Sequence, residues 1–484
     1  MNFRKTRRLA LSRLEDRTTP SVSVTLVSGT LTIRGDNLSN NLLVSEAAPG
    51  KFTVTNNTKT VGTFSFSNLN VLMGNGADTV ELKVATALTG NVTIQTGNGT
   101  DSVTTANSTL GSRVGGDVLI NLGLGGNRPG VNYDQDVSWE NVNIGGNLTV
   151  LGPTGNGAEL VSLEATRIGK SVSVTNIYQT GLGDPDDAAR AVTVGADLSV
   201  NNVQKNTDSR TDTPFTFGGN GLTLNSGTAV NRHLNYTGGN GIDRVFLPAG
   251  TSGTPVTIGG NVTVNVGGGV NNSLVLGTGS VGADVGGNLT FYGGVGIDRF
   301  IMDSGSTVNG NVYLSLGEGN NQVFGDSIGL GVSGPFNPEG DATVGGSVTV
   351  LLGNGDNFIG TYGIDPSTLS VGGNLSIRVG NGNNTGGDAL GPGDITLFNT
   401  ALTVAGTAEY RAGTGTNNID FSNLSTIGAL RLIFSGGPTS LTFSQAGTYF
   451  GDVFIDFGTG FGPKNLAFVP PADLGGNVTI LNYP

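Results

Sequence analysis

The stretch Ile258-Gly259-Gly260-Asn261-Val262-Thr263-Val264 contains the two elements that decide the fold of this chain, a glycine turn and a short apolar strand. In the strand, valine alternates with threonine, so the two residue types point to opposite faces. Glycine allows the turn, and asparagine tolerates left-handed backbone. The same turn and strand recur at residues 144–150, 285–291, 371–377 and 474–480. A supersecondary unit repeated in this way is typical of a solenoid.

A second glycine turn, with the pattern G-x-G-x-(Asp, Asn or Glu), follows most of these strands. Clear copies are Gly74-Asn75-Gly76-Ala77-Asp78, Gly97-Asn98-Gly99-Thr100-Asp101 and Gly294-Val295-Gly296-Ile297-Asp298. The segments between turns are too short and too rich in glycine for the helices of βαβ units. We therefore predict an all-β protein, a parallel β-helix of roughly fifteen coils and on the order of 70 Å long.

The rhythm of the turns divides the chain into three parts. We expect a disordered basic leader at residues 1–21, a divergent β module that caps the solenoid at 22–70, and the β-helical repeat region at 71–484. The cap is expected because an uncovered solenoid end exposes unpaired strand edges. Breaks in the rhythm predict loop insertions near 181–216, 329–340, 362–368 and 386–394.

Composition excludes several classes of site and partner. The chain has no cysteine and a single histidine, His233, which excludes disulfides and argues against Cys/His zinc sites and a Ser-His-Asp triad. The net charge is −12, and residues 1–17 carry +4, so the remainder carries −16. Such an acidic body argues against nucleic acid as a partner. No apolar run is long enough to span a membrane.

The basic leader ends in the segment Leu14-Glu15-Asp16-Arg17-Thr18-Thr19-Pro20. It lacks the apolar core of an ordinary secretory signal. It resembles the opening of the large, repeat-rich surface proteins of planctomycete-type bacteria, in which such a leader precedes exported β-rich regions. The resemblance implies an extracellular or cell-surface location.

The second turn also resembles the nonapeptide of RTX calcium-binding repeats. The resemblance implies calcium as a cofactor, with Asp78, Asp101, Asp243 and Asp298 as its ligands. Asp78 and Asp101 form the best ion candidate, because their spacing predicts adjacent coils. The same position is otherwise occupied by Asn127, Glu159, Asn271, Asn321, Asn357, Asn384 and Asn417. This mixture favours a structural column of Asx turns and stacked amides, since calcium prefers several carboxylates. Both interpretations stay open.

A second column of amides is predicted at the Gly-Gly turns. Its members precede strands and are Asn147, Asn261, Asn288, Asn311, Asn374 and Asn477. Because they recur with the repeat, we expect them to line up from coil to coil and to form hydrogen bonds there.

Candidate residues for enzyme chemistry are few. Arg244 and Arg299 each follow a turn aspartate, roughly two coils apart, and form either a polar surface or a sugar-binding pair. His233 is expected at the surface of a strand. Trp139 beside Glu140 indicates a loop anchor or a sugar platform. Acid–base chemistry on polysaccharides requires clustered carboxylates or basic residues, and the charged residues here are dispersed.

The sequence thus predicts a secreted or cell-surface structural or adhesive β-solenoid without catalytic activity. Its expected partners are surface polysaccharide or envelope components. Two alternatives remain, a carbohydrate-active β-helix enzyme and a calcium-stabilised RTX-like surface module.

Overall fold

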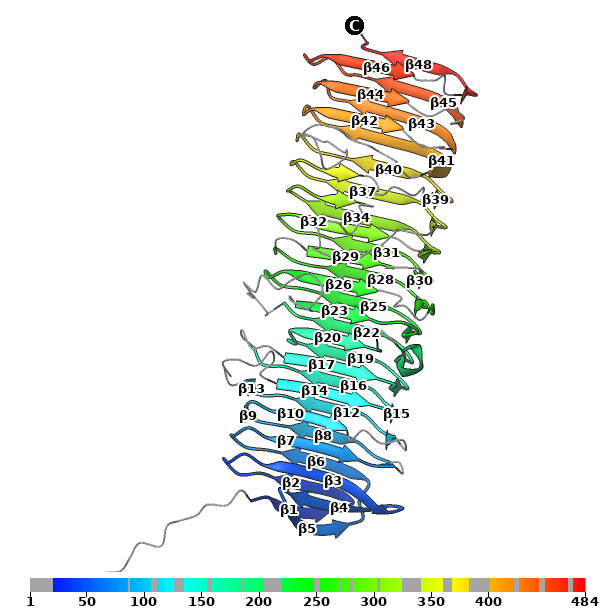
Figure 1. Cartoon of the computed structure of the whole chain (residues 1–484). Coiled ribbons are helices and arrows are strands. Elements are labelled where there is room, and N and C mark those ends of the chain that lie inside the picture. The colour runs from blue at the N-terminus through cyan, green and yellow to red at the C-terminus, as the bar shows by residue number, and fades with distance from the viewer. Residues whose placement is uncertain are drawn as a thin grey trace, which may run out of the picture.

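The structure is a computed structural model in which the chain forms one straight stack of strands (Figure 1). It describes residues 21–85, 88–105, 111–125, 135–154, 159–184, 187–203, 220–247, 253–269, 272–277, 282–302, 305–323, 341–359, 368–382, 401–421, 426–443, 449–468 and 473–483. The leader predicted at 1–21 falls outside these ranges except for Ser21. The insertions predicted at 329–340 and 386–394 also lie outside them, as do most of 362–368 and 201–216.

Each coil contributes strands to three faces of the solenoid. Face 1 holds the strands that follow the Gly-Gly turns, and each pairs in parallel with the strand one coil away. Its strands are β2 (Thr30–Arg34), β6 (Asn68–Leu72), β8 (Val92–Gln95), β12 (Val118–Asn121), β16 (Leu148–Leu151), β19 (Val172–Thr175), β22 (Leu198–Asn201), β25 (Leu234–Thr237), β28 (Val262–Asn265), β31 (Leu289–Tyr292), β34 (Val312–Gly317), β37 (Val348–Leu352), β40 (Leu375–Arg378), β41 (Ala401–Ala412), β43 (Thr426–Phe434), β45 (Tyr449–Asp456) and β48 (Val478–Leu481).

Face 2 holds the strands that follow the G-x-G turns, again in parallel. They are β3 (Asn41–Ala48), β7 (Thr79–Lys83), β10 (Ser102–Thr105), β14 (Gln135–Glu140), β17 (Glu159–Glu164), β20 (Gln179–Leu182), β23 (Asn220–Leu224), β26 (Asp243–Leu247), β29 (Asn272–Leu276), β32 (Asp298–Met302), β35 (Gln322–Val323) and β38 (Phe358–Ile359). A separate sheet of β42 (Asn417–Phe421), β44 (Thr439–Phe443) and β46 (Lys464–Phe468) occupies the same part of the last coils.

Face 3 holds short strands that precede the Gly-Gly turns. They are β11 (Ser112–Val114), β15 (Val142–Ile144), β18 (Arg167–Ile168), β21 (Thr193–Val194), β24 (Ala229–Val230), β27 (Val256–Ile258), β30 (Ala283–Val285), β33 (Thr307–Val308), β36 (Ala342–Val344), β39 (Thr368–Val371) and β47 (Asp473–Leu474). The long strands β41, β43 and β45 continue from face 3 into face 1. A two-stranded sheet of β9 (Asn98–Gly99) and β13 (Leu124–Gly125) links two G-x-G turns, and the 3-10 helix η1 (Ala188–Arg190) lies beside the stack.

The N-terminal end of the solenoid departs from this parallel pattern. β1 (Ser23–Val27) pairs antiparallel with β2, and β3, β4 (Lys51–Asn56) and β5 (Lys59–Phe64) form an antiparallel meander at the blue end of Figure 1. Phe52 and Val54 of β4 are buried. The region 22–70, in which a capping module was expected, contains these antiparallel strands.

The core is one continuous column of apolar side chains inside the coils. Strand alternation explains it: in β28, Val262 and Val264 are fully buried while Thr263 points outward. Phe421, Phe443 and Phe468 are stacked at successive positions of the last coils, with ring centroids 5.1 and 4.9 Å apart. Trp139 also belongs to the core, in β14, so the interpretations of it as a loop anchor or a sugar platform were wrong.

The predicted fold class is confirmed: the protein is an all-β parallel solenoid, although the number of coils differs somewhat from the expected fifteen. Within the described ranges, no helix has the length and apolar character needed to cross a membrane.

The close stacking of the glycine corners gives a first prediction. A Cβ on Gly319, whose φ is +122°, would lie 1.9 Å from the carbonyl oxygen of Gly296, whereas a Cβ on Gly305, with φ +75°, would contact nothing within 4 Å. We expect Gly319→Ala to lower the free energy of unfolding by about 2–4 kcal/mol and Gly305→Ala by about 1 kcal/mol. Urea unfolding followed by circular dichroism measures both. Equal losses would show that the corners do not stack closely.

Candidate functional site

The four aspartates predicted as calcium ligands all lie in one column inside the solenoid. Asp78, Asp101, Asp243 and Asp298 stand where the G-x-G turn enters a strand of face 2, and each is at most 2% exposed. We call this set the inner column. Its other buried members are Asn40, Glu159, Asn272, Asn321, Asn357 and Asn417.

Asp78 and Asp101 lie on adjacent coils, as their spacing predicted, because Thr79 pairs with Ser102. The main-chain N–H of Asn40 donates to Oδ1 of Asp78 over 2.8 Å, and the N–H of Asp78 donates to Oδ1 of Asp101 over 2.9 Å. One carboxylate oxygen of each residue therefore accepts a hydrogen bond from the backbone of the preceding coil.

Asp243 and Asp298 lie two coils apart, with Asn272 between them. The N–H of Asp243 donates to Oδ1 of Asn272 over 2.9 Å, and Nδ2 of Asn272 donates to Oδ1 of Asp298 over 2.9 Å. Asn271 was expected at this position, and assigning it there was wrong, since Asn272 occupies it and this turn is one residue longer. Asn271 itself, with Asn127 and Asn384, lies outside the described residues.

The second side-chain atom distinguishes the aspartates from the asparagines. Nδ2 of Asn321 donates to the carbonyl oxygens of Gly317 and Gly319, each over 3.1 Å. In Asp298 and Asp243, Oδ2 instead accepts from a glycine N–H four residues earlier, over 2.9 and 3.1 Å. In Asp78 and Asp101, Oδ2 is buried and has no hydrogen-bond partner among the described residues.

Burial raises the pKa of all four carboxyl groups. The pKa of Asp101 is raised to about 6 and that of Asp243 to about 7, in both cases mainly by desolvation. Burial likewise raises the pKa of Asp78 and of Asp298. The hydroxyl of Tyr236 donates to Oδ1 of Asp243 over 2.7 Å, which acts in the opposite direction on the pKa of Asp243. Burial in the inner column therefore favours the neutral form of these four carboxyl groups.

A second prediction concerns pH. The folded-state pKa of Asp101 is about 6, above the unfolded value of about 3.9, so its contribution to stability is complete below about pH 4 and is lost as the pH rises to about 6. We expect Asp101→Asn to unfold at the same temperature as the unaltered protein at pH 4. At pH 7.5 we expect it to be more stable by about 1–3 kcal/mol, because Asp101 is then ionised in a buried position while the amide stays neutral. Thermal melts at both pH values test this, and a variant that is less stable at pH 7.5 would contradict it.

A second hydrogen-bonded column runs along the Gly-Gly turns, and we call it the outer ladder. In each rung a side-chain acceptor of one coil receives the main-chain N–H of the next, for example Asn261 Oδ1 from Asn288 N–H over 2.9 Å and Asn288 Oδ1 from Asn311 N–H over 2.8 Å. The rungs are Asn68, Asn91, Asp117, Asn147, Ser171, Asp197, His233, Asn261, Asn288, Asn311, Ser347 and Asn374, and the last of them accepts from Thr407 N–H.

The outer ladder confirms the predicted column of asparagines and extends it. In the last coils, Asn477 N–H donates to Asp452 Oδ1 over 2.9 Å. His233 was expected only as a surface strand residue, but it is a rung. Its N–H donates to Asp197 Oδ1 over 3.1 Å, and its Nδ1 accepts from Asn261 N–H over 3.0 Å. Sequence reasoning missed the non-amide rungs, although they occupy the same place before the strand.

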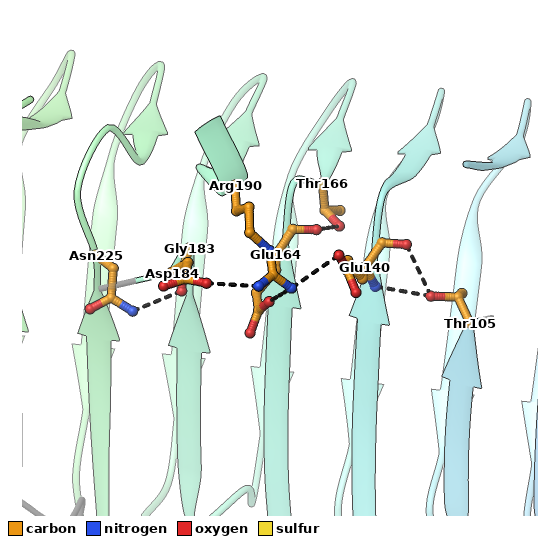
Figure 2. A network of polar contacts seen from close by, with 8 residues as sticks. All are labelled: Thr105, Glu140, Glu164, Thr166, Gly183, Asp184, Arg190 and Asn225. Atoms are coloured by element: carbon orange, nitrogen blue, oxygen red, sulfur yellow. Dashed lines mark hydrogen bonds and ion pairs between the residues drawn. The ribbon is translucent and has the colours of Figure 1, made fainter. Parts of the chain in front are cut away.

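A third polar group lies at the far end of the face 2 strands, around Arg190 (Figure 2). Nη2 of Arg190 lies 3.0 Å from Oε1 of Glu140 and also contacts Oε2 of Glu164, while Nη1 lies 2.8 Å from Oδ2 of Asp184. Glu140 and Glu164 are register partners on β14 and β17, and Asp184 follows β20. One guanidinium thus joins carboxylates from three consecutive coils. Burial raises the pKa of Glu164, and this effect outweighs the positive charge of Arg190, which lowers the pKa.

The loop insertion predicted near 181–216 includes Arg190. The structure instead places Gly181 and Leu182 in β20, and η1 directs Arg190 back onto the stack. Hydrogen bonds link this group to the coil on either side. Glu140 N–H donates to Oγ1 of Thr105 over 2.9 Å, and Asn225 Nδ2 donates to the carbonyl oxygen of Gly183 over 2.8 Å. We call this group the Arg190 clamp.

Arg244 and Arg299 occupy one row of face 2 with Ser273 between them, so their predicted separation of two coils is confirmed. Nε of Arg299 donates to Oε1 of Gln322 over 2.9 Å. In the described part of the chain, no three His, Cys, Asp or Glu side chains are placed to hold a metal ion together. Calcium at the four aspartates therefore stays a prediction.

Comparisons of the chain with protein-family models, with curated proteins and with solved structures give no match.

Proposed function

We propose that this protein is a structural rod of the cell surface or extracellular matrix, with adhesion or envelope coating as its task. The observation that carries the proposal is the outer ladder, which links coil after coil by side-chain to main-chain hydrogen bonds from Asn68 to Thr407. Each rung fixes a corner that strand pairing leaves open. Such links favour a stiff stack that holds its ends a fixed distance apart, on the order of 70 Å.

The Arg190 clamp supports the same proposal. Carboxylates on neighbouring strands are also what a polysaccharide-cleaving enzyme would require. Here Glu140, Glu164 and Asp184 all bind Arg190, which ties three coils together. This arrangement favours a structural role for these carboxylates over acid–base chemistry.

The location is proposed on the leader, whose Leu14-Glu15-Asp16-Arg17-Thr18-Thr19-Pro20 segment resembles that of exported planctomycete-type surface proteins. The absence of cysteine is compatible with export, because backbone and ladder hydrogen bonds take the place of disulfides as links between coils.

A third prediction tests the location. In native cells, we expect antibodies against the solenoid to label intact cells, and we expect external protease to remove the signal while a cytoplasmic marker stays intact. A variant without residues 1–20 is expected to remain inside the cell, because the leader is proposed to direct export. Recovery of the unaltered protein only in the cytoplasmic fraction would overturn the proposed function.

Calcium stabilisation is a second candidate, favoured by one observation. Oδ2 of Asp78 and of Asp101 face the interior on adjacent coils without a donor among the described residues. A bound calcium ion would use such oxygens. The Asp101→Asn variant separates the two interpretations at neutral pH: if calcium binds there, millimolar calcium raises the melting temperature of the unaltered protein and not that of the variant.

A further inference from the structure

The outer surface of face 1 between β31 and β45 carries a run of side chains that the ladders and the clamp do not use. Strand register places them in two neighbouring outward rows, one through Tyr313, Thr349, Ser376, Glu409, Arg431 and Phe454, and the other through Tyr292, Ser315, Leu351, Arg378 and Arg411. We call these rows the face 1 strip. Together the two rows cross β31, β34, β37, β40, β41, β43 and β45, which follow one another along the stack in Figure 1, and so extend over about 30 Å.

One end of the strip is positively charged in an otherwise acidic protein. Arg378, Arg411 and Arg431 surround the single carboxylate of Glu409 and together lower the pKa of that group. Arg411 binds Glu409 through two contacts of 2.6 and 3.1 Å, and Nε of Arg431 lies 3.6 Å from the same carboxylate. The net charge of this cluster is therefore +2, while the whole chain carries −12.

The arginines remain accessible. The side chains of Arg411 and Arg431 are 46% and 48% exposed, and Arg378 is exposed as well. The guanidinium of Arg431 lies over the ring of Phe454, 5.2 Å from its centroid, a cation–π contact. In register beyond Arg411 come Ile433 and then Asp456, whose Oδ1 accepts hydrogen bonds from Gly458 N–H and from Asn482 Nδ2.

The other end of the strip is aromatic. Tyr292 and Tyr313 project outward from β31 and β34, with ring centroids 6.0 Å apart, and Tyr292 is 42% exposed. Exposed tyrosine pairs present an apolar ring and a hydroxyl at the same place, a combination that suits the mixed surface of a sugar ring. Between the two ends lie the hydroxyls of Ser315, Thr349 and Ser376.

We propose that the face 1 strip binds an acidic polysaccharide along the axis of the solenoid. The arginine cluster would pair with carboxylate or sulfate groups, since guanidinium matches such anions with two parallel hydrogen bonds. The tyrosine pair would contact sugar rings farther along the same chain. A flat row of side chains favours an extended polymer, because small ligands bind in concave sites. Several weak contacts along one polymer chain together give a higher affinity than any single contact, because the later contacts form within the same complex.

The inference deepens the proposed surface function, because it names the class of partner. Its test uses purified protein and does not depend on where the protein is located. If the protein binds acidic polysaccharide but is cytoplasmic, the proposed surface function is wrong and the binding role of the face 1 strip stands. If the protein is at the surface but does not bind, the binding role is wrong and the surface function stands.

The test measures binding of the full chain to polygalacturonate, to a sulfated galactan and to neutral dextran by calorimetry. We expect binding to one or both acidic polymers and none to dextran; preference for the first assigns carboxylate as the anion, and preference for the second assigns sulfate. Arg378→Gln with Arg431→Gln should weaken binding roughly tenfold or more. Tyr292→Ala with Tyr313→Ala should weaken it without changing the charge.

The matched control is Arg113→Gln with Arg167→Gln, which removes the same charge from exposed positions of face 3. Its affinity should stay within about twofold of the unaltered protein, and melting temperatures check that all variants are folded. Three results would overturn the proposal: no binding to either acidic polymer, equal loss in the control and the strip variants, or equally tight binding of a single-stranded oligonucleotide through the same arginines.

Discussion

The main-chain N–H groups at the corners of each coil are the constraint on which this structure depends. Strand pairing satisfies the backbone along the three faces, and at the Gly-Gly corners the glycine N–H groups also donate to main-chain carbonyls of the preceding coil, as Gly287 does to Gly260. The N–H of the residue that follows the two glycines has no such main-chain acceptor and donates to a side chain instead. A buried N–H without a partner is costly, and this applies to the inner column, whose donors are buried. The chain solves this by placing a short side-chain acceptor one coil away, in the outer ladder at the Gly-Gly turns and in the inner column at the G-x-G turns. Glycine permits these corners to lie nearly in contact.

This constraint explains why residues of different chemistry are equivalent at one position. Asparagine, aspartate, serine and histidine all serve in the outer ladder, because each offers one side-chain acceptor to the N–H of the next coil. In the inner column, asparagine and aspartate differ in the second atom, which donates in Asn321 and accepts in Asp298. The burial that raises the pKa of the aspartates moves their carboxyl groups toward the neutral, amide-like form.

Local repetition made most of the fold predictable. The alternation in 258–264 assigned inward and outward residues, and the spacing of Asp78 and Asp101 placed them on adjacent coils. Asn271 was predicted in the inner column in place of Asn272 because this turn is one residue longer than the others. The Arg190 clamp and the face 1 strip could not be predicted in the same way. They join residues from separate coils, and only the register of the stack brings such residues together.

Hydrogen exchange at the ladder corners measures directly whether the outer ladder holds the stack together. The N–H groups of Asn91, Asn288 and Asn311 lie outside regular strand pairing and near the surface, yet each donates to a side chain of the preceding coil. If the ladder holds the stack together, these amides exchange as slowly as those of the neighbouring strands β8, β31 and β34. If they exchange as fast as exposed loop amides while the strands stay protected, the ladder does not hold the corners of the stack.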